Sequence, residues 1–170
     1  MEINIAERPV TCCFSGYRPE KLPWTFDEDD PRCEELKRKI ADVIESLYDS
    51  GVRKFVCGMA RGADMYFAEA VIALRETRAG VTLEAAIPCE EQAARWSERE
   101  RARYFRLLSQ CDTETFVSRR YTDDCMRRRN RYMADKSSVI ITVFDGKVGG
   151  TMYTRAYAAR RGLEVIDLKP

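Results

Sequence analysis

The sequence contains no histidine. A Cys/His zinc site, a Ser-His-Asp triad and a Cys-His dyad therefore cannot be assembled within one chain. Any acid–base catalyst would have to be a carboxylate, a lysine, a tyrosine or a cysteine. The 7 cysteines form no Cys-x-x-Cys pair, and Cys12, Cys13 and Cys57 lie in apolar runs. We expect reduced and mostly buried thiols, and no metal site is visible in the sequence.

Long hydrophobic runs are also missing. No apolar stretch approaches the roughly 20 residues that cross a membrane, and residues 1–4 lack the basic and then apolar pattern of a signal peptide. We therefore expect a cytoplasmic protein that does not enter a membrane. The net charge of +1 gives no global attraction to nucleic acid or membrane. The length of 170 residues, 45% of them hydrophobic, predicts a single domain over residues 1–170 with its own core.

Strand-like and helix-like patterns alternate along the whole chain. Short apolar runs of β-forming residues predict strands at residues 9–14, 54–57, 81–87, 113–117, 137–144 and 163–168. Amphipathic stretches between them predict helices at residues 31–50, 63–78, 90–109, 123–136 and 151–161. Such an alternation requires a parallel sheet covered by helices on both faces. The predicted fold class is therefore α/β, with a mostly parallel central sheet between two helical layers.

The turn at residues 55–64 (Phe-Val-Cys-Gly-Met-Ala-Arg-Gly-Ala-Asp) joins a predicted strand to a helix. Such a glycine turn can bind an anion, because the backbone approaches the ligand closely and free N–H groups open the helix. Gly62 is not followed by Lys-Ser or Lys-Thr, and the glycine spacing is not that of a dinucleotide fingerprint. The alternative is a turn that merely needs its glycines. Asp64 either complements the helix dipole or accepts a hydrogen bond from a ribose hydroxyl or a base.

Two further loops follow predicted strands and belong to the same edge of the sheet. In residues 15–18 (Ser-Gly-Tyr-Arg), Gly16 permits close approach of a ligand and the planar fork of Arg18 suits phosphate. Residues 149–151 (Gly-Gly-Thr) open the last helix. Trp24 is expected either to anchor its loop on the core or to stack on a base. Three such loops at one edge favour a nucleotide-like or phosphorylated ligand, with three structural glycine turns as the alternative.

The segment at residues 118–132 is rich in arginine and contains interleaved tyrosines. Arg127 and Arg131 are spaced four residues apart on a predicted helix and could hold one anion together. The tyrosines also make single-stranded nucleic acid a conceivable ligand. The alternative, which we favour at this point, is a solvated or salt-bridged helix face.

These motifs together resemble those of a known family. They are residues 15–19 and 22–24, residues 58–64, the Arg129-Asn130 pair and residues 149–154. They look like the motifs of the YpsA-type proteins (the DUF1273 group), which belong to the SLOG superfamily with the DNA-processing protein DprA and the LOG phosphoribohydrolases. The resemblance covers essentially the whole chain. It implies a Rossmann-like three-layer sandwich that binds a nucleotide or nucleotide-derived ligand at the glycine turns.

The function that this resemblance favours is that of a small-molecule sensor or binder. Phosphates would lie on backbone N–H groups of the two glycine turns, and side chains would bind the sugar or the base. The predicted ligand-binding residues are Ser15, Gly16, Arg18, Gly58, Met59, Ala60, Arg61, Gly62, Asp64, Asn130, Gly149, Gly150 and Thr151. No further cofactor is expected. A homodimer is plausible for this class, with the helix face around Trp96 as a candidate contact.

Two alternatives stay open. LOG enzymes carry Pro-Gly-Gly-x-Gly-Thr-x-x-Glu in the region that resembles residues 149–154, whereas here the first Pro-Gly is missing and Thr154 stands where the catalytic Glu would be. LOG-like hydrolysis of nucleotides or phosphoribosyl compounds would have Asp64, Glu69 or Asp145 as its acid–base groups. DprA-like binding of single-stranded nucleic acid would use the basic segment 119–131, although the near-neutral net charge does not favour it.

Overall fold

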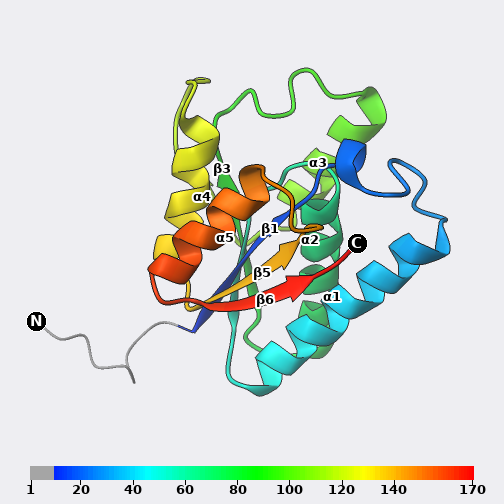
Figure 1. Cartoon of the computed structure of the whole chain (residues 1–170), viewed down its shortest axis with the longest axis vertical. Coiled ribbons are helices and arrows are strands. Elements are labelled where there is room, and N and C mark those ends of the chain that lie inside the picture. Colours follow the sequence, from blue (N-terminus) through cyan, green and yellow to red (C-terminus); the bar gives the residue numbers. More distant parts are fainter. Residues whose placement is uncertain (1–9) are drawn as a thin grey trace, which may run out of the picture.

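The computed structural model describes residues 10–170 (Figure 1). Six strands form one sheet in the order β4-β3-β2-β1-β5-β6, and every neighbouring pair is parallel. The strands are β1 (Thr11–Gly16), β2 (Lys54–Cys57), β3 (Thr82–Ile87), β4 (Thr113–Phe116), β5 (Val139–Val143) and β6 (Glu164–Leu168). The signal-peptide prediction for residues 1–4 and the predicted strand start at Pro9 lie outside the described residues.

Helices cover both faces of the sheet, which confirms the predicted α/β class. They are α1 (Pro31–Asp49), α2 (Ala63–Thr77), α3 (Glu98–Leu108), α4 (Cys125–Asp135) and α5 (Gly150–Arg160), with a short 3-10 helix, η2 (Pro19–Lys21). Helices α1 and α2 pack together on one face, and α4 and α5 pack together on the other (Figure 1). Within residues 10–170, no helix is both long and apolar enough to cross a membrane.

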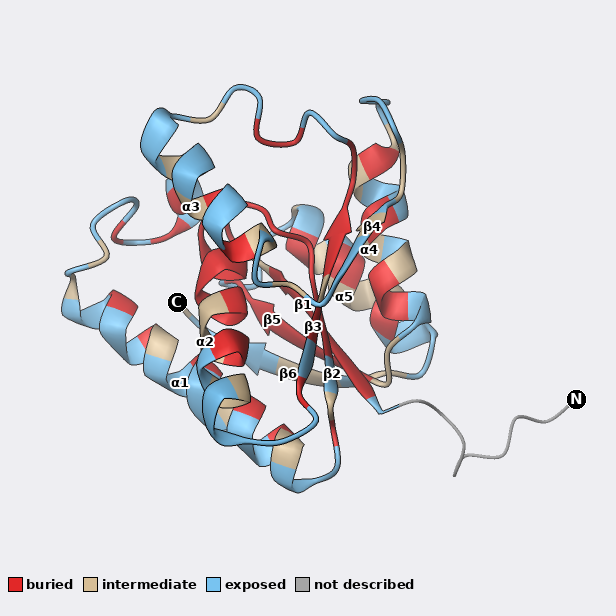
Figure 2. Cartoon of the chain, turned by 180° about the vertical axis from the view of Figure 1, so that it is seen from behind, coloured by how far each residue is buried: buried red, intermediate tan, exposed pale blue. Residues whose placement is uncertain are grey.

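The central strands are buried on both faces, as a parallel sheet between two helical layers requires. All residues of β5 are buried, and Figure 2 shows the buried strands between the helices. The larger apolar cluster lies under α1 and α2, where the rings of Phe14 and Phe67 stack with centroids 4.7 Å apart. A smaller cluster, which includes Cys13, Ile140 and Met133, lies under α4 and α5. The 7 cysteines all lie within the described residues, form no disulfide and are mostly buried, as expected.

The strand order reverses between β1 and β5, and this reversal positions the candidate site. After β1 the sheet grows outward through β2, β3 and β4, and the chain then returns to place β5 on the other side of β1. The Tyr17 N–H donates to the Val143 carbonyl at 3.0 Å, beyond the last paired residues of the two strands. The chain after β1 leads to α1 on one face of the sheet, and the chain after β5 leads to α5 on the other face. In open α/β sheets, ligands bind in the crevice that such a divergence leaves at the carboxyl ends of the strands.

The predicted helix at residues 90–109 is wrong in its first part. Helix α3 begins at Glu98, because the Ser97 hydroxyl accepts the Glu100 N–H at 3.2 Å and the Glu100 carboxylate accepts the Ser97 N–H at 3.0 Å. This reciprocal capping box fixes the helix start. The preceding residues form turns after β3, so Trp96 lies in a turn and not on a helix face.

Two other boundaries differ slightly from the prediction. Helix α4 begins at Cys125, because the Thr122 hydroxyl donates to the Asp124 carboxylate at 2.9 Å and does not cap the helix. Strand β1 extends to Gly16, because its pairing with β5 continues to the end of that strand. The glycine therefore belongs to the last residues of the strand rather than to the loop.

Candidate functional site

A cavity of about 210 Å³ lies in the crevice between the ends of β1 and β5. The loop after β1, the turn before α2, helix α4 and the first turn of α5 contribute to its wall. Its lining residues are Phe14, Ser15, Gly16, Tyr17, Arg18, Glu20, Lys21, Ala60, Asp64, Arg129, Asn130, Met133, Gly150 and Thr151. The structure thus brings together eight of the predicted residues, namely Ser15, Gly16, Arg18, Ala60, Asp64, Asn130, Gly150 and Thr151.

Arg129 lines this cavity with only 4% of its surface exposed, although it is not among the predicted ligand-binding residues. Its guanidinium donates to the Gly58 carbonyl, to the Ala86 carbonyl at 3.3 Å and to the amide oxygen of Asn130 at 2.8 Å. No carboxylate oxygen of residues 10–170 lies within 4.0 Å of it. Burial lowers the pKa of Arg129, and the charge of Asp64 opposes this effect. A buried cation held only by neutral acceptors would gain from an anionic ligand.

Asp64 lies in the first turn of α2 and is 5% exposed. Its carboxylate accepts the Ala60 N–H at 3.0 Å. Burial raises the pKa of Asp64 to about 6, and the positive charge of Arg129 limits this rise. The Ala63 N–H donates to the Tyr17 carbonyl at 3.0 Å. The N–H groups of Ala60 and Ala63 are therefore already bonded within the protein. The turn has fewer free N–H donors for a phosphate than its sequence suggests.

Asp64 should make the stability of the protein depend on pH in a defined direction. Its pKa is about 6 in the folded chain, against about 3.9 for an unfolded aspartate, so the folded state binds more protons between these values. The ionisation of Asp64 therefore makes the free energy of unfolding rise as the pH falls from about 6 to about 4. We expect Asp64→Asn to be more stable than the wild type by roughly 2 kcal/mol at neutral pH, and the difference to disappear near pH 4. Urea denaturation at both pH values tests this, and a pH-independent difference would contradict it.

The other predicted residues of the turn before α2, which are Gly58, Met59, Arg61 and Gly62, lie outside the cavity. Gly58 packs so closely on Arg129 that a Cβ atom would lie 2.7 Å from the guanidinium carbon. Met59 is fully buried. Gly58 therefore has the structural role that the sequence left open, because its carbonyl accepts the Arg129 guanidinium and its lack of a side chain makes room for that group.

Arg61 points instead into a larger hollow of about 800 Å³ on the other side of η2, between α2 and α3. Its guanidinium forms ion pairs with Glu20 at 2.8 Å and Glu100 at 3.1 Å. The lining of this hollow contains as many acidic as basic side chains. It therefore offers no net attraction for a phosphate, despite its size.

Of the three carboxylates considered for acid–base chemistry, only Asp64 faces the cavity. Glu69 lines the larger hollow and is bound to Arg103 at 2.8 Å. Asp145 accepts the Tyr17 hydroxyl, and this hydrogen bond lowers the pKa of Asp145 to about 2. Within residues 10–170, no group of three or more His, Cys, Asp or Glu side chains could hold a metal ion.

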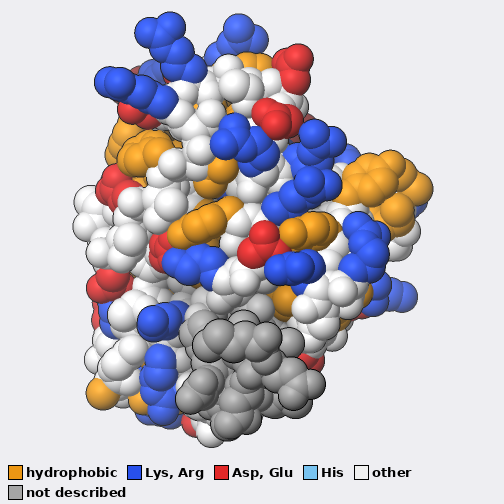
Figure 3. All heavy atoms as spheres, turned by 90° about the vertical axis from the view of Figure 1, so that its left-hand side faces the viewer, with side chains coloured by type: hydrophobic (Ala, Val, Ile, Leu, Met, Phe, Trp, Pro, Cys, Tyr) orange, Lys and Arg blue, Asp and Glu red, His pale blue; other side chains and the backbone are white. Residues whose placement is uncertain are grey.

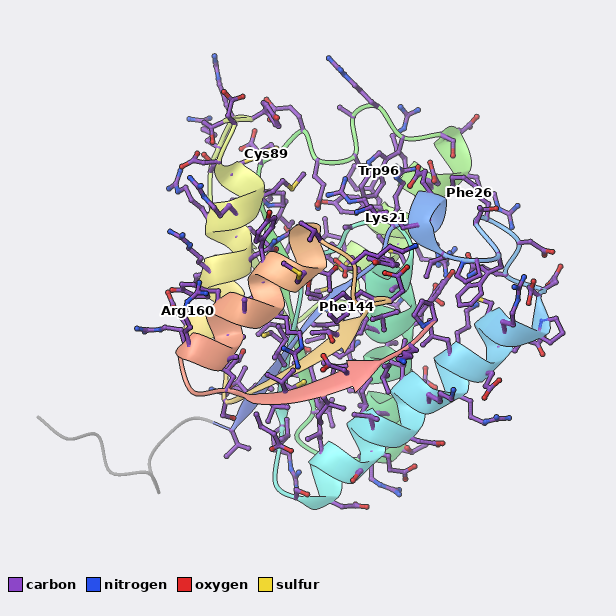
Figure 4. The ribbon with its side chains drawn as sticks, in the orientation of Figure 1. Lys21, Phe26, Cys89, Trp96, Phe144 and Arg160 are labelled. Carbon is purple, nitrogen blue, oxygen red and sulfur yellow. The ribbon has the colours of Figure 1, made fainter. Side chains whose placement is uncertain are left out.

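Lys21 and the amino-terminal end of α5 meet at the mouth of the cavity. Gly149 is the N-cap of α5 and provides no side-chain cap. Although Gly149 does not line the cavity, a Cβ atom on it would lie 2.9 Å from Lys21 Nζ, and Figure 4 shows Lys21 near this end of the helix. Among the described residues, no carboxylate lies within 4.0 Å of this ammonium group. The positive end of the helix dipole and a free cation therefore converge on a point suited to an anion.

Placement also decides between the two roles that the sequence left open for Trp24. Trp24 is buried, and its indole N–H donates to the Tyr66 hydroxyl at 3.2 Å. It therefore anchors the loop on the core and does not offer a face to a base. Arg127 and Arg131 are exposed on the outer side of α4 and do not line the cavity.

Comparison of sequences places the chain among a group of related bacterial proteins. The model of the YpsA family, described as the YspA SLOG family, matches residues 12–164. A UPF0398 protein of Bacillus pumilus is 25% identical over 139 residues, which cover 81% of this chain and 74% of the relative. A UPF0398 protein of Halalkalibacterium halodurans is 27% identical over 151 residues, which cover 87% of this chain and 79% of the relative.

Comparison of structures finds the same fold in DNA processing protein A. The Helicobacter pylori protein, whose structure concerns its single-stranded DNA binding mode, matches 95% of this chain with a TM-score of 0.61 and 16% identity. The Streptococcus pneumoniae protein matches 93% of this chain with the same TM-score and identity. The chain spans only 66% and 50% of these two proteins. At this identity the likeness concerns the fold alone.

Proposed function

Because this chain belongs to the YpsA family of SLOG proteins, we propose that it binds a phosphorylated, nucleotide-like ligand in the cavity between β1, α4 and α5. The observation that carries the proposal is the excess of positive charge around a small polar cavity. Arg18, Lys21 and Arg129 line it. Of the two acids in its wall, Glu20 is already paired with Arg61, so Asp64 alone opposes these three cations.

The ligand's phosphate would lie between Lys21, Arg18 and the first turn of α5, which includes Gly150 and Thr151. Asp64 and Asn130 are the groups placed to bind sugar hydroxyls or the edge of a base. The cavity of about 210 Å³ is smaller than the roughly 300–1,000 Å³ of sites that enclose drug-sized ligands. It therefore has room for a phosphate and its sugar but does not enclose a whole nucleotide.

The structural relatives support this class of ligand. Helicobacter pylori DNA processing protein A binds single-stranded DNA, which is a chain of phosphorylated nucleosides. Both proteins would then bind a ligand that carries a phosphate on a sugar.

Binding is tested by isothermal titration with nucleoside 5′-monophosphates and diphosphates, with the unphosphorylated nucleosides and inorganic phosphate as comparisons. We expect the phosphorylated nucleosides to bind more tightly than either part alone. Arg18→Ala and Lys21→Ala should each weaken binding about tenfold, which corresponds to about 1.4 kcal/mol for one charge-assisted contact. A protein that only binds the nucleotide should return it intact after incubation, whereas the hydrolase alternative predicts release of free base.

Arg38→Ala is the matched control, because Arg38 is exposed on α1, on the opposite face of the sheet. Its affinity should equal that of the wild type. Equal weakening in all three variants would show that the effect comes from net charge and would contradict a site at the cavity. Equal affinity for nucleosides and nucleotides would contradict the phosphate contacts.

A further inference from the structure

Positive charge is concentrated on α4 and α5. Residues 125–136 and 150–161 contain eight Lys and Arg side chains and one acid, although the whole chain has a net charge of only +1. Figure 3 shows Lys and Arg side chains gathered on the side of the molecule that these helices form. The near-neutral total therefore hides two basic helices, and the rest of the chain is acidic.

The outward stripes of the two helices place arginine and tyrosine side by side. On α4, the exposed residues Arg127, Arg128 and Arg131 are spaced by three and four positions and share one face. On α5, Tyr153, Tyr157 and Arg160 follow the same spacing. We call these six residues the α4–α5 face. The Arg131 guanidinium lies 5.3 Å from the centre of the Tyr157 ring, so the two stripes are in contact.

The arginines of the α4–α5 face are not neutralised by the protein itself. Asp135 is the acid on these helices, and it is bound to Arg161 at 3.1 Å and to the Tyr157 hydroxyl at 2.7 Å. Among residues 10–170, no carboxylate oxygen lies within 4.0 Å of Arg127, Arg128 or Arg160. The pattern differs on α1, where several basic residues are paired, such as Arg32 with Asp30 and Lys39 with Glu35. A salt-bridged surface therefore describes α1 and not the α4–α5 face.

We infer that the α4–α5 face binds single-stranded nucleic acid. Arginine side chains would contact successive phosphates, and tyrosine rings would stack on unpaired bases. The Tyr153 ring, which is 63% exposed, is the clearest stacking platform. A duplex keeps its bases stacked inside and would use the charges but not the rings. This face lies outside the cavity, so the inference does not depend on the ligand proposed for that site.

Fluorescence anisotropy with labelled single strands of DNA and RNA, and with a duplex of equal length, tests this inference. We expect both kinds of single strand to bind at low salt, with the comparison between them showing which the protein prefers. Contacts from four arginines would give a slope of log affinity against log salt of roughly −3, because single strands release about 0.7 counterion per contact. Arg128→Glu combined with Arg131→Glu should weaken binding about tenfold or more, since each change removes a contact and adds repulsion.

The control is Arg38→Glu combined with Lys39→Glu on α1, which makes the same change of charge on the opposite face. Its affinity for single strands should stay within about twofold of that of the wild type. Tyr153→Ala should weaken single-strand binding several-fold and leave weak duplex binding unchanged. Circular dichroism and urea denaturation verify that each variant folds. The inference would be overturned if single strands did not bind at low salt, or if the α1 control variant lost as much affinity as the α4 variant. It would also be overturned if the duplex bound as tightly as the single strands and Tyr153→Ala had no effect on either.

Discussion

Replacing Arg129 with methionine is expected to lower the free energy of unfolding by about 3 kcal/mol. Methionine can fill much of the space, but it cannot donate to the carbonyls of Gly58 and Ala86, which the guanidinium now bonds. The Ala86 carbonyl loses this donor, and the Gly58 carbonyl keeps only the bond from the Gln92 side-chain amide at 3.3 Å. Asp64 also loses the positive charge that limits the rise of its pKa. The same variant should lose nucleotide binding, since Arg129 is one of three cations in the cavity wall.

Arg128→Met is the matched control for this variant. Arg128 precedes Arg129 on the same helix, but it is exposed and has no carboxylate partner among the described residues. Its replacement should change the free energy of unfolding by less than about 0.5 kcal/mol. Urea denaturation of both variants measures the difference. Equal effects of the two changes would mean that the bonds from Arg129 to the Gly58 and Ala86 carbonyls do not stabilise the fold.

Replacing Gly62 with alanine should destabilise the fold by about 3 kcal/mol and displace the loop after β1. Gly62 has φ of +84°, a conformation that side chains rarely adopt. A Cβ atom there would also lie 2.6 Å from the Tyr17 carbonyl and 3.0 Å from the Arg18 Cα. The contact between the β1 loop and the start of α2 would have to open. Because both segments form the cavity wall, ligand binding should be lost together with stability.

Gly146→Ala separates conformational strain from steric contact. Gly146 has a similar φ of +91°, but nothing lies within 4 Å of a Cβ atom placed there. Only the backbone strain remains, so its cost should be about 1 kcal/mol. Thermal or urea unfolding of the two variants gives the comparison. Equal destabilisation would mean that the close approach of the β1 loop to Gly62 contributes nothing.

The sequence predicted the fold because its local patterns agree with the global arrangement. The run that forms β5 is apolar on both faces, and this marked it as a central parallel strand. The start of α3 was misplaced because Ala93 and Trp96 continue the apolar spacing of that helix toward its amino end. Both residues do contribute to the core, but from turns. The Ser-x-x-Glu pattern at residues 97–100 was the signal that could have placed the helix start.

The meeting of three loops at one edge followed from topology, whereas the role of Arg129 did not. Arg129 is one of several arginines in the same stretch, and only the orientation of α4 distinguishes it. Its spacing of four residues from the buried Cys125 and Met133 is the one sequence signal that it faces inward. The division of the turn before α2, with Asp64 facing the cavity and Arg61 facing away, depends on backbone geometry that glycine spacing does not specify.

The proposed ligand site is tested most directly by native mass spectrometry of protein incubated with a mixture of nucleotides and then freed of unbound ligand. The wild type should retain one phosphorylated nucleoside per chain, and denaturation should release it for identification. A variant that combines Arg18→Ala with Lys21→Ala should retain none, whereas Arg38→Ala should retain as much as the wild type. Retention that persists in the double variant, or no retention in the wild type at millimolar nucleotide, would contradict a phosphate site between β1, α4 and α5.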